Sequence, residues 1–167
     1  MTESWSCQPA TAERLALDLL MHDGLMTPVL QSRFGPMYAV ELHRSETGDR
    51  YDRVSEVRQR GTGLLLLDSR MSIRVSALPA AMLDALRNTD TPFGQLLQGA
   101  GIAARSVSRE ITRLAGEDGA PDRLGRRHII VDAATDAPIC DLHEVLNHAE
   151  VLLAAAGPMA GGIRHGA

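Results

Sequence analysis

Lysine is absent from this sequence, and all 17 basic side chains are arginine. A chain without lysine cannot form a Schiff base and cannot supply the lysine of a phosphate-binding P-loop. Cysteine is also scarce, because only Cys7 and Cys140 occur, so a disulfide is not expected. The six histidines have no paired spacing with these cysteines, and no metal site is predicted.

Long apolar runs and clustered basic residues are missing too. No run approaches the roughly 20 apolar residues that cross a bilayer, and the first residues lack the basic and apolar segments of a secretory signal. The net charge is −4 and the arginines are spread along the chain. We therefore expect a cytoplasmic protein without a membrane or nucleic-acid partner.

The 167 residues have room for a single domain, with loose ends at 1–8 and 157–167. Hydrophobic and turn-residue spacing predicts an exposed loop at 45–53 and a hairpin turn at Asp68-Ser69. Because strands follow one another without βαβ alternation, the predicted fold class is α+β, a mostly antiparallel sheet with helices on one side. Helices are predicted at 11–22, 27–33, 79–87, 91–100 and 147–155, and strands at 37–43, 55–67, 70–77, 103–114, 126–132 and 138–145.

Glu144 is the first candidate for chemistry. In the predicted strand 138–145 it shares a face with Cys140 and Leu142, the more apolar of the two faces. A carboxyl group on such a face either ends in solvent or enters the interior with a partner. A partly buried glutamate has a raised pKa that suits proton transfer, whereas a surface glutamate at a strand end has no such role.

Arg60 is the predicted partner of Glu144. It falls in the predicted strand 55–67, just before the apolar run LLLL, and its planar guanidinium matches a carboxylate. The same sequence pattern is also typical of an arginine in a structural ion pair, or of one that reaches to the edge of the sheet. Arg58 shares the same face and competes for the role.

Two short elements have the pattern of ligand-binding turns. Thr91 to Gly94 (TPFG) is a loop-to-helix transition that leaves the backbone N–H groups of Phe93 and Gly94 free to bind an anion. Residues 24–27 (GLMT) could bring the Met26 backbone towards a ligand in the same way. An ordinary helix start explains both elements equally well.

Taken in order, these segments resemble the chorismate pyruvate-lyase family over about residues 12–147. The features that carry the resemblance are the GLMT element, Arg60 before GTGLLLL, the TPFG element, LGRR at 124–127, and a last strand from Pro138 to Glu144. The resemblance implies a chorismate lyase-like fold. It also implies an enzyme that splits chorismate into 4-hydroxybenzoate and pyruvate in a buried pocket, without cofactor or metal.

Carried over by position, Arg60 binds the ring carboxylate and Glu144 hydrogen-bonds the oxygen that becomes the phenol. Met26, Phe93 and Gly94 complete the implied substrate-binding set. Oligomeric state is left open between monomer and homodimer. Related folds serve as effector-binding domains of bacterial regulators, but those carry a DNA-binding helix-turn-helix for which this chain has no room.

Three residues depart from the family pattern: Phe93 stands for the usual leucine, and Asp141 and His143 interrupt the last strand. They keep two alternatives open. One is the same fold catalysing an elimination or cyclisation on another natural-product intermediate. The other is a non-catalytic module that binds an aromatic acid. His143 itself points to the face opposite Glu144 and is expected to be solvated.

Overall fold

A computed structural model describes residues 8–157 of the chain as one six-stranded sheet covered by helices. The strand order is β1-β2-β3-β6-β5-β4, and every neighbouring pair is antiparallel. The strands are β1 (Met37–Thr47), β2 (Arg50–Gln59), β3 (Leu65–Arg74), β4 (Ala104–Leu114), β5 (Arg123–Asp132) and β6 (Pro138–Leu146). The helices are α1 (Gln8–Leu20), α2 (Met26–Phe34), α3 (Ala80–Asn88), α4 (Phe93–Gly99) and α5 (Ala149–Ala156), with a short 3₁₀ turn, η1 (Val75–Ala77).

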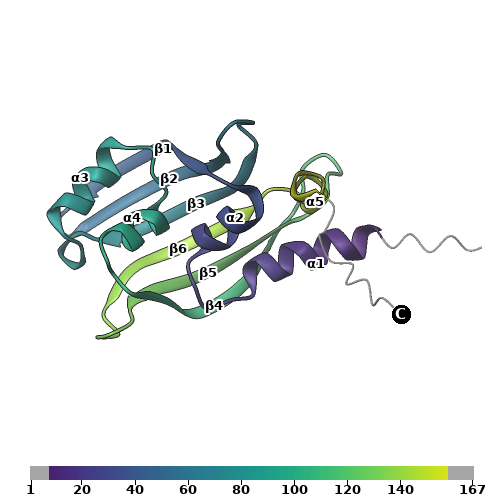
Figure 1. The fold of residues 1–167 in the computed structure, drawn as a ribbon. Coiled ribbons are helices and arrows are strands. Elements are labelled where there is room, and N and C mark those ends of the chain that lie inside the picture. Colours follow the sequence, from purple (N-terminus) through teal and green to yellow (C-terminus); the bar gives the residue numbers. More distant parts are fainter. Residues whose placement is uncertain (1–7, 158–167) are drawn as a thin grey trace, which may run out of the picture.

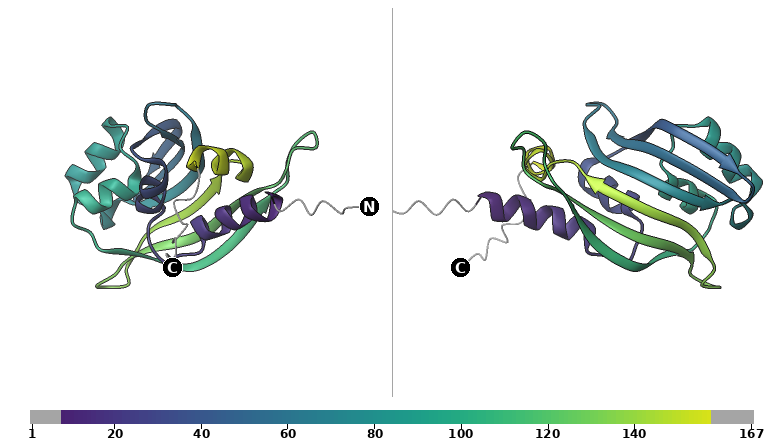
Figure 2. Two further views of the ribbon diagram at one scale, coloured as in Figure 1. Left: turned by 45° about the vertical axis from the view of Figure 1, so that its right-hand side comes forward. Right: turned by 180° about the vertical axis from the view of Figure 1, so that it is seen from behind.

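All the helices lie on one face of the sheet. Figure 1 shows them in front of the strands, and the rear view in Figure 2 shows the opposite face of the sheet uncovered. The predicted fold class, α+β with a mostly antiparallel sheet and helices on one side, is therefore confirmed. The predicted loose ends at 1–8 and 157–167 fall almost wholly outside the described residues.

The sheet consists of two three-stranded halves, β1-β2-β3 and β4-β5-β6, that join between β3 and β6. Each half is built from consecutive antiparallel strands, while α3 and α4 connect the halves along the chain. The centre of the inner face is therefore the junction between the two halves, and Figure 1 shows the covering helices in front of it.

The hairpin between β2 and β3 differs from the prediction. The chain turns at residues 60–64, where Gly61 and Gly63 have φ of 101° and 72°, a conformation that glycine adopts without steric cost. Asp68 and Ser69 instead lie inside β3. The predicted loop 45–53 was wrong as well, because β1 continues to Thr47 and β2 begins at Arg50.

The two edge strands are both irregular. The register of β1 against β2 shifts between Glu41 and His43, and that of β4 against β5 shifts between Val107 and Glu110. Ser108, inside the second irregularity, has a φ of 52°. Such β-bulges add a residue to one strand and bend it locally.

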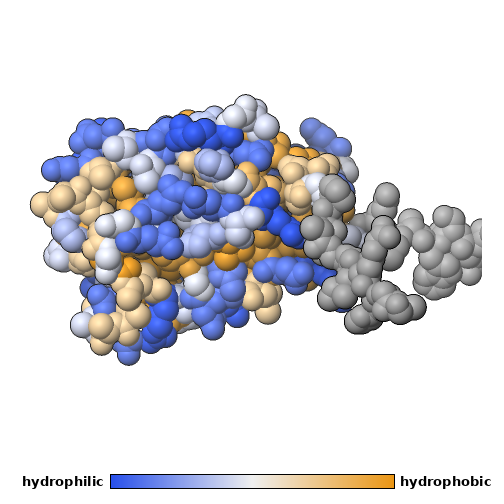
Figure 3. Space-filling view, viewed as in Figure 1, coloured by the Kyte–Doolittle hydropathy of each residue, from blue (hydrophilic) through white to orange (hydrophobic). Residues whose placement is uncertain are grey.

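Two apolar clusters fill the space between helices and sheet. One lies under α1, α2 and α5 and includes Leu20, Leu30 and Leu146; the other lies under α3 and α4 and includes Leu86, Leu97 and Ile130. Figure 3 views this side of the molecule: hydrophobic residues show as orange between the hydrophilic, blue residues of the covering helices. What separates the two clusters on the inner face is polar.

Candidate functional site

Buried polar side chains gather in one region of the inner face. Because burying such groups is costly without partners, their position in a fold is informative. Of the eight buried polar or charged residues in the described chain, seven project from strands β2 to β6 and one from α2. They are Thr27, Arg53, Ser55, Ser69, Ser106, Arg126, His128 and Glu144. This set, which we call the polar band, marks the candidate site.

Strand register explains why these residues meet. Side chains directly opposite one another in a sheet share a face, as do side chains two residues apart on one strand. One cross-strand row runs Ser55, Ser69, Glu144, Arg126, and the next runs Arg53, Met71, Leu142, His128. Arg53 and Glu144 are thus two strands and two residues apart, which separates their Cα atoms by about 12 Å.

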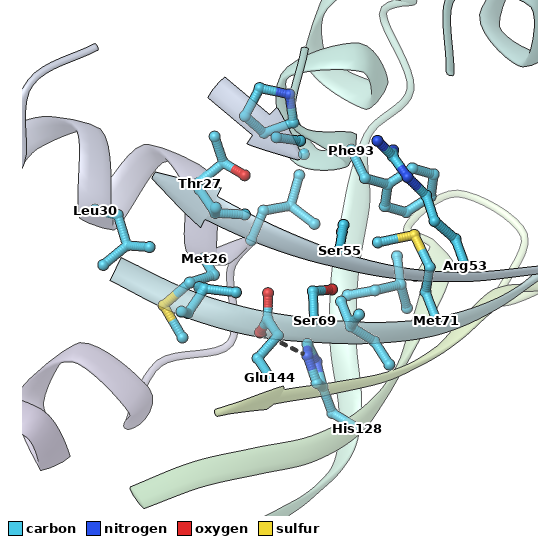
Figure 4. A pocket seen from close by; sticks show the side chains of 18 residues that line it. Met26, Thr27, Leu30, Arg53, Ser55, Ser69, Met71, Phe93, His128 and Glu144 are labelled. Atoms are coloured by element: carbon cyan, nitrogen blue, oxygen red, sulfur yellow. Dashed lines mark hydrogen bonds and ion pairs between the residues drawn. The ribbon is translucent and has the colours of Figure 1, made fainter. Parts of the chain in front are cut away.

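A cavity lies above these rows. Residues from α2 and from the start of α4 form its roof, among them Met26, Leu30 and Phe93 (Figure 4). Its floor contains Arg53, Ser55, Ser69, His128 and Glu144. The cavity encloses about 30 Å³ of free space. That volume suits a group the size of a water molecule, so a larger ligand needs the roof or the floor side chains to move.

At the Glu144 end, protein donors surround the carboxylate. Nε of Arg126 donates to Glu144 Oε2 over 2.9 Å, and Nε2 of His128 lies 3.1 Å from the same oxygen. An ionised carboxylate only accepts hydrogen bonds, so Nε2 of His128 carries its proton and donates. Nδ1 of His128 in turn lies 2.6 Å from Ser106 Oγ. In Figure 4 the other oxygen of Glu144 points into the pocket.

These partners keep Glu144 ionised. Burial alone would raise its pKa, but the hydrogen bond from His128 and the positive charge of Arg126 outweigh burial and hold the pKa below its ordinary value. This is opposite to the raised pKa expected for a partly buried glutamate from the sequence. The free oxygen of Glu144 is therefore an acceptor for a ligand N–H or O–H group.

Arg126 connects this end of the band to the N-terminal loop. Its side chain is fully buried and donates to the backbone oxygens of His22 over 3.1 Å and Gly24 over 3.2 Å. Burial and the charge of Arg126 lower the pKa of His22. With carbonyl oxygens on one side and Glu144 on the other, the charge of Arg126 is compensated within the protein.

At the other end, Arg53 has few partners. It is 2% exposed, and its Nε is buried without a hydrogen bond. Its nearest carboxylate is Glu41, whose Oε2 is 3.3 Å from Nε but outside hydrogen-bond geometry. Burial lowers the pKa of Arg53, yet an arginine remains charged at neutral pH. A buried cation with so little compensation is a strong anion-binding group.

The structure does not bring Arg60 and Glu144 together, and the predicted pairing was wrong. Arg60 lies in the turn after β2, is 53% exposed, bonds Asp90 over 2.9 Å and stacks on the Tyr38 ring at 5.2 Å. The reason is the turn at 60–64, which takes Arg60 out of the strand. Arg58, the competing candidate, pairs with Glu56 and does not line the cavity.

The remaining predicted residues do meet at the cavity. Met26, Phe93, Gly94 and Glu144 all line it, although their role in substrate binding stays a prediction. Gly94 has a structural reason as well, because a Cβ atom there would lie 2.5 Å from Thr27 Oγ1. His143 is on the opposite face, as predicted, but it is half-buried against Thr112 and not solvated as expected.

Sequence reasoning missed Arg53, Arg126, His128, Ser55 and Ser69. The first four of these lie on β2 and β5, where a signal exists: the apolar residues Tyr51 and Val57, and Leu124 and Ile130, belong to the same alternation as the missed positions. That alternation is hidden where charged residues occupy both faces of the strand. Ser69 was read as a turn residue.

Comparisons with known proteins identify no family. No family model matches the sequence, and no curated protein matches it. Solved structures match in fold only. A Staphylococcus aureus gene product has a TM-score of 0.49 and 9% identity, covering 77% of this chain and 90% of that one. The ligand-binding domain of a putative GntR-family transcriptional regulator from Bordetella bronchiseptica has a TM-score of 0.48 and 9% identity, covering 66% of this chain and 85% of that one. A GntR-family transcriptional regulator from Bacillus cereus has a TM-score of 0.45 and 7% identity, covering 66% of this chain and 90% of that one. Similarity at this level carries no argument about ligand or activity.

Two kinds of feature are absent from residues 8–157. None of the helices between residues 8 and 157 combines the length and the hydrophobicity that a membrane crossing requires. Within the same range, no group of three or more histidine, cysteine or acidic side chains is arranged to hold a metal ion. Cys140 is a buried free thiol whose pKa is raised by burial, and Cys7 lies outside the described residues.

Proposed function

We propose that this chain binds a small aromatic carboxylic acid that carries a hydroxyl group at the end opposite its carboxylate. The observation that carries the proposal is the buried, poorly compensated guanidinium of Arg53 at one end of the cavity. A ligand carboxylate would supply the missing negative charge and accept hydrogen bonds from the unused N–H groups of Arg53.

The Glu144 end supports the second half of the proposal. Its carboxylate is held ionised by Arg126 and His128, and one oxygen points into the pocket. A carboxylate at the other end of the ligand would be repelled by this group, whereas a hydroxyl would donate to it. The two ends therefore select a molecule with one acidic end and one donor end.

The walls between the ends suit a ring. They are formed by apolar side chains, mainly Met26, Leu30, Met71, Phe93 and Leu142. Methionine is flexible and polarisable and packs well on aromatic faces. Two methionines among the walls also provide a way for the cavity to widen from about 30 Å³ when a ring enters.

Calorimetric titration of the chain with 4-hydroxybenzoate tests the proposal. Benzoate and 4-hydroxybenzyl alcohol, which lack the hydroxyl and the carboxylate respectively, should both bind more weakly. Arg53→Met should weaken 4-hydroxybenzoate binding by about 30-fold or more, since a buried charge pair is lost. Arg60→Met, which removes an exposed arginine, is the matched control and should change the affinity by less than about threefold. No binding of 4-hydroxybenzoate at millimolar concentration would refute the proposal.

Chorismate pyruvate-lyase activity at the same pocket is the second candidate function. The ionised Glu144 beside His128 favours it, because a carboxylate at that point can take the proton from the ring carbon that bears the hydroxyl. The bond between the ring and the enolpyruvyl oxygen then breaks, the ring becomes aromatic, and the released enolpyruvate takes up a proton to give pyruvate. The rest of the pocket would hold the substrate in a reactive pose.

Incubation with chorismate separates the two candidates. Release of 4-hydroxybenzoate, followed by its absorbance, supports the lyase, and Glu144→Gln should then lower turnover by about 100-fold or more. A flat trace from folded protein that binds 4-hydroxybenzoate leaves the binding module, or an enzyme for another intermediate, as the function.

A further inference from the structure

Two serines form the middle of the cavity floor. Ser55 on β2 and Ser69 on β3 are directly opposite each other in the sheet, and they are only 2% and 3% exposed. Both line the cavity, and Figure 4 shows both between Arg53 and Glu144. Within residues 8–157, neither hydroxyl forms a hydrogen bond with another residue, whereas the third buried serine, Ser106, bonds His128.

Ser69 interrupts an apolar series of inward positions on β3, and Ser55 lies between Arg53 and Val57 on the inward face of β2. The other inward positions include Tyr51 and Val57 on β2, and Leu67 and Ile73 on β3. Apolar residues at 55 and 69 would continue the apolar walls of the cavity, whereas two serines place hydroxyl groups on its floor that no other described residue bonds. A pair of such groups at one level of two neighbouring strands therefore indicates a ligand that bonds them.

Their place along the cavity fixes which part of the ligand they meet. Ser55 is two residues from Arg53 on the same strand, and Ser69 is directly opposite Glu144 across β3 and β6. A ring that spans from the Arg53 guanidinium to the Glu144 carboxylate passes over both hydroxyls. The polar group they would bond is thus on the ring edge, next to the group that reaches Glu144.

We infer that the ligand carries a second ring oxygen beside its distal hydroxyl, so that the chain recognises 3,4-dioxygenated ring carboxylic acids in preference to 4-hydroxybenzoate. Ser55 and Ser69 are the specificity-determining residues. The inference rests on the proposed function and sharpens it. The second oxygen is a hydroxyl or an ether, and the enolpyruvyl ether of chorismate occupies the same ring position, so the inference holds for a binding module and for a lyase.

Three acids distinguish this inference from the proposed function. The chain is titrated with 4-hydroxybenzoate, with 3,4-dihydroxybenzoate, and with 2,4-dihydroxybenzoate, in which the extra hydroxyl is beside the carboxylate. The 3,4-isomer should bind about tenfold more tightly than 4-hydroxybenzoate, the gain expected from about one hydrogen bond. The 2,4-isomer should show no gain. Equal or weaker binding of the 3,4-isomer overturns the inference and leaves the proposed function intact; failure of all three to bind overturns both.

The double variant Ser55→Ala/Ser69→Ala assigns the preference to the two hydroxyls. It should lose the tenfold preference for the 3,4-isomer, measured as the ratio of its affinities for 3,4-dihydroxybenzoate and 4-hydroxybenzoate. Ser72→Ala, a change on the opposite face of β3, should keep the preference. A preference that survives in the folded double variant overturns the role of the serines. The single variants, each expected to lose about threefold, test the same point should the double variant unfold.

Discussion

The two ends of the cavity treat buried charge in opposite ways. At one end, Glu144 receives hydrogen bonds from Arg126 and His128, and Arg126 is held in turn by backbone oxygens. At the other end, Arg53 has a buried Nε without a hydrogen bond and a single carboxylate nearby. The protein completes the first set of interactions by itself and leaves the second incomplete.

This difference separates stability from recognition. A compensated buried ion pair is needed for folding once it is present, because removing one partner leaves the other charge buried. A buried cation with a single carboxylate nearby stabilises the unliganded fold less, and its unbonded N–H group is available to a ligand. We therefore expect the Glu144 end to govern the stability of the free protein and the Arg53 end to govern affinity.

The largest expected effect is on the compensated end. Glu144→Gln keeps the shape of the side chain but removes the charge that faces Arg126, and should lower the free energy of unfolding by about 3–5 kcal/mol. Urea titration followed by circular dichroism measures it. The double variant Glu144→Leu/Arg126→Met, which removes both charges, should be more stable than Glu144→Gln; equal losses would mean that the pair is not the unit of stability.

The roof is common to both ends, and its closest contact is at Gly94. A methyl group there would lie 2.5 Å from Thr27 Oγ1, so Gly94→Ala should cost about 1–3 kcal/mol as α2 and α4 are pushed apart. Combining it with Thr27→Ala should recover part of the loss in thermal unfolding. Gly99→Ala, in the same helix with open space around it, should be neutral or slightly stabilising.

A smaller effect is expected at the incomplete end. Arg53→Met removes a charge that the fold hardly compensates, so the free energy of unfolding should change by no more than about 1 kcal/mol, towards greater stability. Urea titration beside Glu144→Gln gives the comparison directly. If Arg53→Met destabilises the chain as much as Glu144→Gln does, the two ends do not differ in the way described.

Acid should weaken the Glu144 end, with the smallest effect near neutrality. The pKa of Glu144 is lower in the folded chain than in the unfolded one, where it is about 4.3. Its stabilisation is therefore fully present above that value and is lost as the pH falls through the lower, folded pKa. Thermal unfolding between pH 2 and 7 should show the loss. Glu144→Gln should make the loss smaller, whereas Glu117→Gln, in an exposed loop, should not.

How far the sequence predicts this molecule depends on the element. Strand 138–145 corresponds to β6, with Glu144 buried on the face of Cys140 and Leu142, because a single apolar alternation identified both strand and face. The GLMT and TPFG elements begin α2 and α4 and line the cavity. In these segments local pattern and tertiary position agree, which is why they could be predicted.

The β2–β3 hairpin shows where prediction failed. The letters RGTG were read as strand, and the run containing Arg53 as an exposed loop. Two errors therefore exchanged two arginines: the misplaced turn put Arg60 in the predicted cavity, and the predicted loop 45–53 removed Arg53 from it. The available signal was the pair Gly61 and Gly63, because glycine adopts the positive φ that such a turn needs. The partners of Glu144 were beyond local pattern, because Arg126 and His128 reach it through strand pairing across the sheet.

The bulges in β1 and β4 have a consequence for the chain in concentrated solution. An open sheet has unpaired backbone N–H and C=O groups along both edge strands, and a regular edge strand can pair with a strand of another molecule. Here both edge strands, β1 and β4, are bent by an extra residue, so neither has an uninterrupted row of backbone groups for such pairing. Fibrillar growth by strand addition is thereby disfavoured.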